Sequence, residues 1–340
     1  MAVTVTDAHQ SSRQTFCRPI PDVGTTVTVV GTDIAALVPP WEPVAGIAIV
    51  LFALAGVVAW ADNRPLERRL STLAWAALAV VWAVMLPYFA FEARSPLQGV
   101  GLAIAIPLSL WTGYIRWSGR DGLVVIGNAI AIIGAIYLPI ASFEPTRRWL
   151  IETVAVHTHW LMGQFGHHPG IAPDHAVGYA SKFDFDGHTT YIVMACTGLG
   201  SIAVFTGAML AVEGDWRRKL TGVALIATII YGLNLVRNAF VALATPFGWF
   251  DFEPFLSTTA VLGIDPIRNS YFVSHTLLAQ PVSLLVVLGL TVLAIRFVPG
   301  VLTLLDEVIY VLTGDDIDLQ SEVGPWLLGE HTEGHEPGAD

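Results

Sequence analysis

The chain has 340 residues, of which 54% are hydrophobic and only 13% are charged. Soluble domains carry about 25% charged residues, so this composition excludes a large water-soluble core and indicates an integral membrane protein. The 28 acidic residues outnumber the 17 basic residues, and only Lys182 and Lys219 are lysines. An acidic surface repels nucleic acid, which argues against such a partner, and it suits a high-salt environment.

The chain has two cysteines, Cys17 and Cys196. Two cysteines are too few for a disulfide framework or for a cysteine-rich metal site. Cys17 lies in a polar segment, and we expect it to have no role unless it pairs with Cys196.

Seven apolar segments predict transmembrane helices, because a helix needs about 20 apolar residues to cross the hydrocarbon core. In chain order they are Val44–Trp60, Leu70–Tyr88, Val100–Tyr114, Gly122–Ala141, Tyr191–Val212, Leu220–Thr245 and Tyr271–Val298. The predicted fold is therefore an all-α, polytopic transmembrane bundle of about seven spans, within a range of six to eight. Residues 1–43 would precede this transmembrane domain (44–298), and residues 299–340 would form an acidic tail.

Basic residues predict the orientation of the bundle. They concentrate in the loops after the first, third and fifth spans, at Arg64, Arg68, Arg69, Arg116, Arg120, Arg217, Arg218 and Lys219. Loops rich in arginine and lysine stay in the cytoplasm, so we expect a multi-pass protein of the cell membrane with its N-terminus outside and its C-terminus inside.

Three segments outside the predicted spans carry further expectations. The long outer loop Ser142–Thr190 contains Arg147–Phe165, which is amphipathic enough to lie on the membrane surface. A second outer loop is Pro246–Ser270. In the tail, Val301–Val311 is predicted to be an interfacial helix and the remainder to be disordered.

Ionisable side chains inside predicted spans are costly and therefore indicate function. Cys196, Arg237 and His275 lie in the fifth, sixth and seventh spans. At a rise of 1.5 Å per residue they lie about 7, 13 and 6 Å from the outer ends of their spans. The flexible arginine side chain can bridge much of the difference in depth. The sequence thus predicts that these three groups meet near the outer face.

This combination of groups suits acyl transfer from a peptide carbonyl. Positive charge near a thiol favours its nucleophilic thiolate form. The imidazole of His275 can take up or return a proton near neutral pH. The guanidinium of Arg237 can stabilise the thiolate or the oxyanion of a tetrahedral intermediate. Each residue alone is more often structural, and the joint arrangement carries the hypothesis.

The same residues lie in motifs that resemble those of the exosortase/archaeosortase family. The run Ala195-Cys196-Thr197-Gly198-Leu199-Gly200-Ser201 is similar to the cysteine motif of that family. Leu235-Val236-Arg237-Asn238 matches its arginine motif, and Tyr271-Phe272-Val273-Ser274-His275 follows in order. The resemblance covers residues 184–280, and the likeness is greatest to members from halophilic archaea.

The resemblance implies a membrane-embedded cysteine transpeptidase, or cysteine protease, that sorts proteins to the cell surface. Residues 44–298 would then be the catalytic domain, with the active site facing outside and no cofactor. Its clients, such as the S-layer glycoprotein, would carry a Pro-Gly-Phe motif, a transmembrane helix and a basic tail. The enzyme would remove the helix and join the new C-terminus to a membrane lipid. The family also suggests Arg268 as a rival or helper for His275.

Two other functions remain open from the sequence. The long outer loop is rich in zinc-binding residue types, namely His157, His159, His167, His168, Asp174, His175, Asp184, Asp186 and His188. A metal-dependent membrane hydrolase could use them, although they lack a recognised tight spacing and we expect no metal site. A non-enzymatic transporter or assembly factor would place Arg237 on a substrate path.

Overall fold

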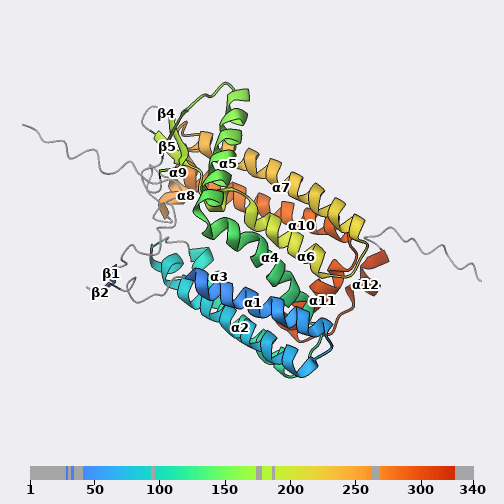
Figure 1. Ribbon diagram of the computed structural model, residues 1–340. Helices are drawn as coiled ribbons and strands as arrows, with labels where there is room; N and C mark the ends of the chain where they lie inside the picture. Colours follow the sequence, from blue (N-terminus) through green and yellow to red (C-terminus); the bar gives the residue numbers. More distant parts are fainter. Residues whose placement is uncertain are drawn as a thin grey trace, which may run out of the picture. The chain divides into compact units, whose positions relative to one another are not determined.

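The computed structural model of the protein describes residues 28–29, 32–33, 41–92, 96–173, 178–185, 188–261 and 269–325 (Figure 1). Six helical segments are long and apolar enough to cross a membrane, and a seventh apolar helix is shorter. The long segments are Trp41–Trp60, Arg64–Ala90, Gln98–Trp117, Val124–Ser142, Trp216–Ala244 and Asn269–Phe297, and the shorter helix is Leu199–Ala211. This confirms the predicted polytopic helical fold.

Two of the long segments contain a π-helical turn. Helix α2 (Arg64–Pro87) continues as a π-helix over Tyr88–Glu92, and a second π-helical turn, Phe272–Ala279, joins α9 (Asn269–Tyr271) to α10 (Gln280–Phe297). The other spanning helices are α1 (Trp41–Trp60), α3 (Pro96–Trp117), α4 (Val124–Ser142) and α7 (Trp216–Ala244). Such turns insert an extra residue into a helix, and they often occur at functional sites.

The chain divides into two compact units. One, here called the loop unit, contains residues 144–198 and 231–285 among those described. The other, here called the helix unit, contains the remaining described residues of 23–143, 199–230 and 286–325.

In the helix unit, α1 packs against α2 and α4, α2 packs against α3, and α4 packs against α6 (Leu199–Ala211). The close packing of α4 and α6 requires Gly207, because a side-chain carbon there would lie 2.7 Å from the carbonyl oxygen of Ala129. Small residues at helix contacts are typical of membrane bundles, where close backbone approach drives association.

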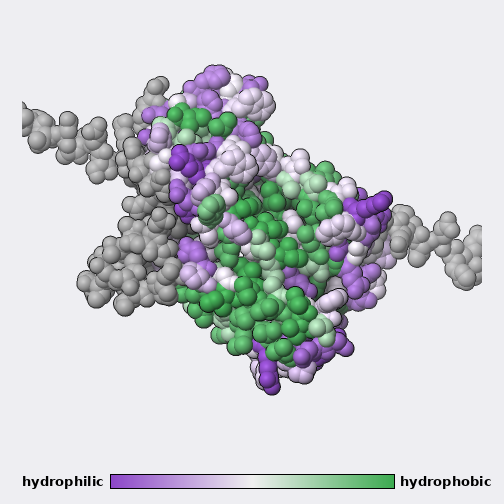
Figure 2. Space-filling model, in the orientation of Figure 1, coloured by the Kyte–Doolittle hydropathy of each residue, from purple (hydrophilic) through white to green (hydrophobic). Residues whose placement is uncertain are grey.

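Large apolar side chains cover the outer surface of this unit. On α1, Ile47, Val50, Leu54 and Val57 are all exposed. Figure 2 shows hydrophobic residues gathered over the α1 and α2 region. A patch of this kind is unfavourable in water, so it supports burial of these helices in lipid.

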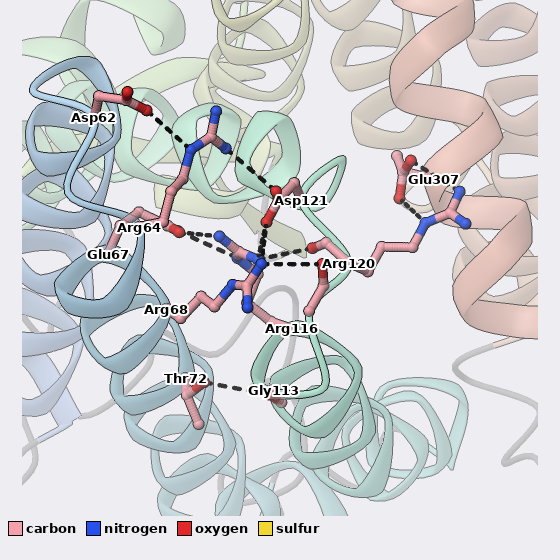
Figure 3. A network of polar contacts seen from close by, with 11 residues as sticks. Asp62, Arg64, Glu67, Arg68, Thr72, Gly113, Arg116, Arg120, Asp121 and Glu307 are labelled. Atoms are coloured by element: carbon pink, nitrogen blue, oxygen red, sulfur yellow. Dashed lines mark hydrogen bonds and ion pairs between the residues drawn. The ribbon is translucent and has the colours of Figure 1, made fainter.

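A buried ion pair joins two helices of the helix unit at the end near the α1–α2 and α3–α4 loops (Figure 3). The guanidinium of Arg116 on α3, with none of its side chain exposed, pairs with Glu67 on α2, which is 1% exposed. Arg116 also donates to Asp121 over 2.9 Å. Nearby, Arg120 donates two hydrogen bonds to Glu307, at 2.9 and 3.0 Å. The loop arginines therefore have a structural role as well as the topological one predicted from the sequence.

Glu307 belongs to α11 (Val301–Thr313), which confirms the helix predicted over Val301–Val311. The prediction of disorder beyond it is wrong for α12 (Leu319–Glu322). The carboxylate of Asp318 caps this short helix by accepting from the amides of Gln320 and Ser321. The composition of the tail indicated only a polar segment, because composition does not reveal a local capping interaction of this kind.

The loop unit contains α5 (Glu144–Gln164), a helix that covers most of the segment Arg147–Phe165, whose predicted place on the membrane surface stays a prediction. It also contains an antiparallel sheet that the sequence analysis did not predict, formed by β3 (Gly170–Pro173), β4 (Ala180–Phe185) and β5 (His188–Tyr191) in that order. Within this unit, α5 contacts β4, and the buried Phe183 of β4 belongs to the same apolar cluster as Val154 and Met162 of α5. The sheet therefore shares one core with the helix.

Two smaller features complete the described fold. Helix α8 (Phe255–Val261) lies in the second predicted loop, and the two-residue strands β1 (Thr28–Val29) and β2 (Thr32–Asp33) pair antiparallel.

The buried pair between Glu67 and Arg116 generates a stability prediction. Glu67→Gln is expected to lower the free energy of unfolding by about 3 kcal/mol, because the buried guanidinium of Arg116 loses the negative charge of its partner Glu67. Thermal unfolding of the purified protein in one detergent measures the change. The matched control is Asp62→Asn, which removes the charge of an exposed carboxylate that bonds Arg64. Exposed pairs contribute little, so equal effects of both substitutions would contradict the prediction.

Candidate active site

Cys196 does not lie inside a membrane-spanning helix, contrary to the predicted span Tyr191–Val212. It ends a short 3₁₀ turn, Met194–Cys196, between β5 and α6. Tyr191 belongs to β5 and pairs with Lys182 of β4, and the pairing continues where the amide of Ile192 donates to the carbonyl of Ser181. The apolar helix therefore begins eight residues later than predicted, and the depth inferred for Cys196 does not apply.

The carbonyl of Cys196 is held by two amides of α7. Nδ2 of Asn234 donates to it over 2.6 Å, and Nδ2 of Asn238 donates over 2.8 Å. The two asparagines are one helical turn apart, so they face the same side of α7. On its other side, the amide of Cys196 donates to the carbonyl of Val193 over 2.8 Å. These bonds fix the backbone that carries the thiol.

Gly198 allows this close contact with α7. Its φ of +78° is a left-handed conformation that glycine adopts without strain. A side-chain carbon at this position would also lie 3.3 Å from the Asn234 side chain. Both the backbone conformation and the available space therefore favour glycine two residues after Cys196.

The three residues predicted from separate spans line one cavity. Cys196, Arg237 and His275 share it with Thr190, Tyr191, Ile192, Asn238, Val241 and Ala242. All of these residues belong to the loop unit. The cavity has a volume of about 20 Å³, which is enough for one water molecule or one carbonyl oxygen. All three residues therefore border one space of atomic size.

Local structure orients each of these side chains. Cys196 is 8% exposed and belongs to the apolar cluster that includes Ile192 and Ala242. Arg237 is half-buried and precedes Asn238, the residue that bonds the Cys196 carbonyl. His275 lies in the π-helical turn and stacks on Tyr271, with ring centres 4.9 Å apart. An aromatic ring against the imidazole restricts its rotation, which favours a fixed direction of proton transfer.

The histidines of the long loop have other contacts. Nδ1 of His157 lies 2.5 Å from the hydroxyl of Tyr231, and Nε2 of His159 lies 3.1 Å from the carbonyl of Pro169. His167 packs against Phe247, with ring centres 4.8 Å apart. Within the described ranges, no three His, Cys, Asp or Glu side chains are grouped to hold a metal ion. The metal-dependent hydrolase therefore gains no support from these residues.

Several candidate residues lie outside the described residues. They are Cys17, Asp174, His175, Asp186 and Arg268. Conversely, the cavity contains Thr190 and Tyr191, which the sequence analysis did not select. The signal that could have found them is the run Thr189-Thr190-Tyr191-Ile192-Val193, because β-branched and aromatic residues in succession are typical of a strand.

The two asparagine contacts predict how Cys196 responds to a thiol reagent. In a background with Cys17→Ser, the double substitution Asn234→Ala and Asn238→Ala removes both donors to the Cys196 carbonyl. At roughly 1 kcal/mol for each hydrogen bond, local opening of the turn should become about 30-fold more frequent. The rate of maleimide labelling of Cys196 measures this opening. Thr228→Ala, also on α7, is the control, and an unchanged labelling rate in the double variant would contradict the assigned contacts.

Comparison with known proteins relates this site to a family. The family model of the transmembrane exosortases matches residues 41–252, which include Cys196 and Arg237 but not His275. The chain is 36% identical over 287 residues to archaeosortase A of Haloferax volcanii, covering 80% of this chain and 94% of that protein. It is 35% identical over 292 residues to archaeosortase A of Natronomonas pharaonis, covering 82% and 91%. No solved structure matches the chain. The chain belongs to the transmembrane exosortase family.

Proposed function

We propose that the protein is a membrane-embedded cysteine transpeptidase that cleaves the C-terminal sorting signal of surface proteins and joins the new C-terminus to a membrane lipid. The observation that carries this proposal is the cavity shared by Cys196, Arg237 and His275 in a member of the exosortase family. The similarity to two archaeosortases over most of their length supports the sorting role.

In the proposed reaction, Cys196 first transfers its thiol proton to His275, and the thiolate Sγ then attacks the carbon of a peptide carbonyl near the Pro-Gly-Phe motif of the client. A carbon–sulfur bond forms, and the electron pair of the carbonyl moves to its oxygen. Arg237 stabilises this oxyanion, as a charged donor does most effectively in a site of low dielectric. His275 delivers a proton to the nitrogen of the leaving peptide as the carbon–nitrogen bond breaks. A thioester on Cys196 remains.

The second half of the reaction resolves the thioester. A nucleophilic group of a membrane lipid attacks the thioester carbonyl, His275 accepts its proton, and the thiolate of Cys196 leaves. A cavity of about 20 Å³ can accept the carbonyl oxygen of the thioester during this step.

The proposed clients carry a Pro-Gly-Phe motif, a transmembrane helix and a basic tail, as expected for the S-layer glycoprotein. Because client and enzyme would share one membrane plane, their effective concentration is high and the cleavage site has a fixed depth. We place the active site on the outside, with the N-terminus outside and the C-terminus in the cytoplasm. Pairing of the loop arginines with carboxylates leaves this orientation intact, because the positive-inside tendency counts basic residues rather than net charge.

The two cysteines offer a matched test of the proposal. Cys196→Ala is expected to reduce client processing to background, because the substitution removes the proposed nucleophile that forms the thioester. Cys17→Ser should process at the wild-type rate. Mass shift of the client in membranes measures processing, and a thioester between Cys196 and a client fragment should be captured by mass spectrometry. Processing by Cys196→Ala would exclude the cysteine mechanism.

A second pair of substitutions separates His275 from Arg268. Removal of a general acid typically slows a reaction by about 10²- to 10⁴-fold. His275→Ala should therefore lower the rate of client cleavage by at least about 100-fold, whereas Arg268→Ala should stay within a few-fold of wild type. The reverse pattern would transfer the third role to Arg268. Comparable amounts of each variant in the membrane are the control for folding.

A further inference from the structure

Thr190 is a buried polar residue in the cavity beside Cys196. It lies on β5 and is paired with Phe183 of β4. The residue is 1% exposed and lines the cavity with Cys196 and Arg237. Its hydroxyl has no hydrogen-bond partner among the described residues. Thr190 therefore brings a hydroxyl without a partner among the described residues to the lining of the cavity that Cys196 also borders.

A buried hydroxyl without a partner is unfavourable, and most such groups in folded proteins are hydrogen-bonded. The presence of such a hydroxyl is explained if a bound ligand supplies its hydrogen-bond partner. This explanation applies only to a hydroxyl that lies at a cavity where a ligand can bind. Thr158 on α5 is also fully buried and unpartnered, but it does not line the cavity. Within the described ranges, Thr190 alone combines an unsatisfied buried donor with a position at the cavity of Cys196.

The sheet holds Thr190 in place. On one side of it, Thr189 is paired with Asp184, and on the other, Tyr191 is paired with Lys182. Two residues further on, the amide of Ile192 donates to the carbonyl of Ser181 over 2.9 Å. The turn that follows is anchored to α7 through the carbonyl of Cys196. Thr190 and Cys196 are thus connected by a short, hydrogen-bonded segment, so the donor is in place before a substrate binds.

We infer that Thr190 is a catalytic residue whose hydroxyl donates a hydrogen bond to the oxygen of the carbonyl group whose carbon Cys196 attacks. This inference rests on the proposed function. As the carbon–sulfur bond forms and the carbonyl electron pair moves to oxygen, the bonds from Thr190 and Arg237 shorten and strengthen. When the carbon–nitrogen bond breaks, the pair returns to re-form the carbonyl. Thr190 keeps its proton throughout, so the step balances without a further reactant.

The two donors would have different functions in the cavity. The guanidinium carries charge and reaches the cavity from α7 on a long, flexible side chain. A threonine on a paired strand has a short side chain with restricted rotation, so it costs little ordering when the oxyanion forms. Thr190 would therefore define where the oxygen lies, whereas Arg237 would supply most of the charge stabilisation.

The test compares Thr190→Val with Thr158→Val in the full-length protein. Both substitutions replace an unpartnered buried hydroxyl with a methyl group of similar size, so both should fold. Loss of one oxyanion donor reduces kcat by about 10²- to 10³-fold. We expect this loss for Thr190→Val, with KM for a full-length client nearly unchanged, and the wild-type rate for Thr158→Val. Thr190→Ser, which keeps the hydroxyl, should recover most of the rate.

The outcomes separate this inference from the proposed function. If Cys196→Ala is inactive and Thr190→Val forms the Cys196 thioester at the rate of Thr158→Val, the role of Thr190 is overturned and the cysteine mechanism stands. A Thr190→Ser variant as slow as Thr190→Val, with the wild-type unfolding temperature, also overturns it. Activity of Cys196→Ala would overturn the proposed function itself. Rescue by serine together with loss in valine is the result that supports the hydroxyl.

Discussion

The carbonyl of Cys196 is the point where the strand segment and the membrane helix α7 are tied together. It accepts hydrogen bonds from the side chains of both Asn234 and Asn238. Arg237 lies between these two asparagines on the same helix. One helical surface therefore sets both the position of the thiol and the starting point of the guanidinium. If these amides were lost, the turn could move away from Arg237 while every other element of the loop unit kept its own contacts. The candidate chemistry depends on this attachment more than on any apolar contact.

Hydropathy predicted the helical spans well because lipid imposes a simple requirement. Each spanning segment must satisfy its backbone groups internally and present apolar side chains, and both conditions are visible in a run of residues such as α1 or α4. The grouping of Cys196, Arg237 and His275 was predictable for a related reason. Reactive or charged side chains are rare in such apolar runs, so the few that occur can be identified as candidates for function.

The surroundings of Cys196 were not predictable in the same way. Tyr191–Val212 is almost continuously apolar, so hydropathy extended the helix through Cys196 and missed the change at Gly198. The three-stranded sheet was missed because its strands have only four to six residues and its core is shared with α5. The position of Thr190 at the cavity became visible only in the structure. These features depend on contacts between distant segments, which hydropathy does not detect.

The position of the thiol ahead of α6 has a consequence for how a polypeptide could approach it. An extended backbone surrounded by acyl chains would leave its amide and carbonyl groups without partners, at a cost of several kcal/mol for each group. Under the proposed function, Cys196 would meet its client where the client's own helix starts. The first four amides of any helix already lack intrahelical acceptors, so little helix would have to unwind for the chain to be cut.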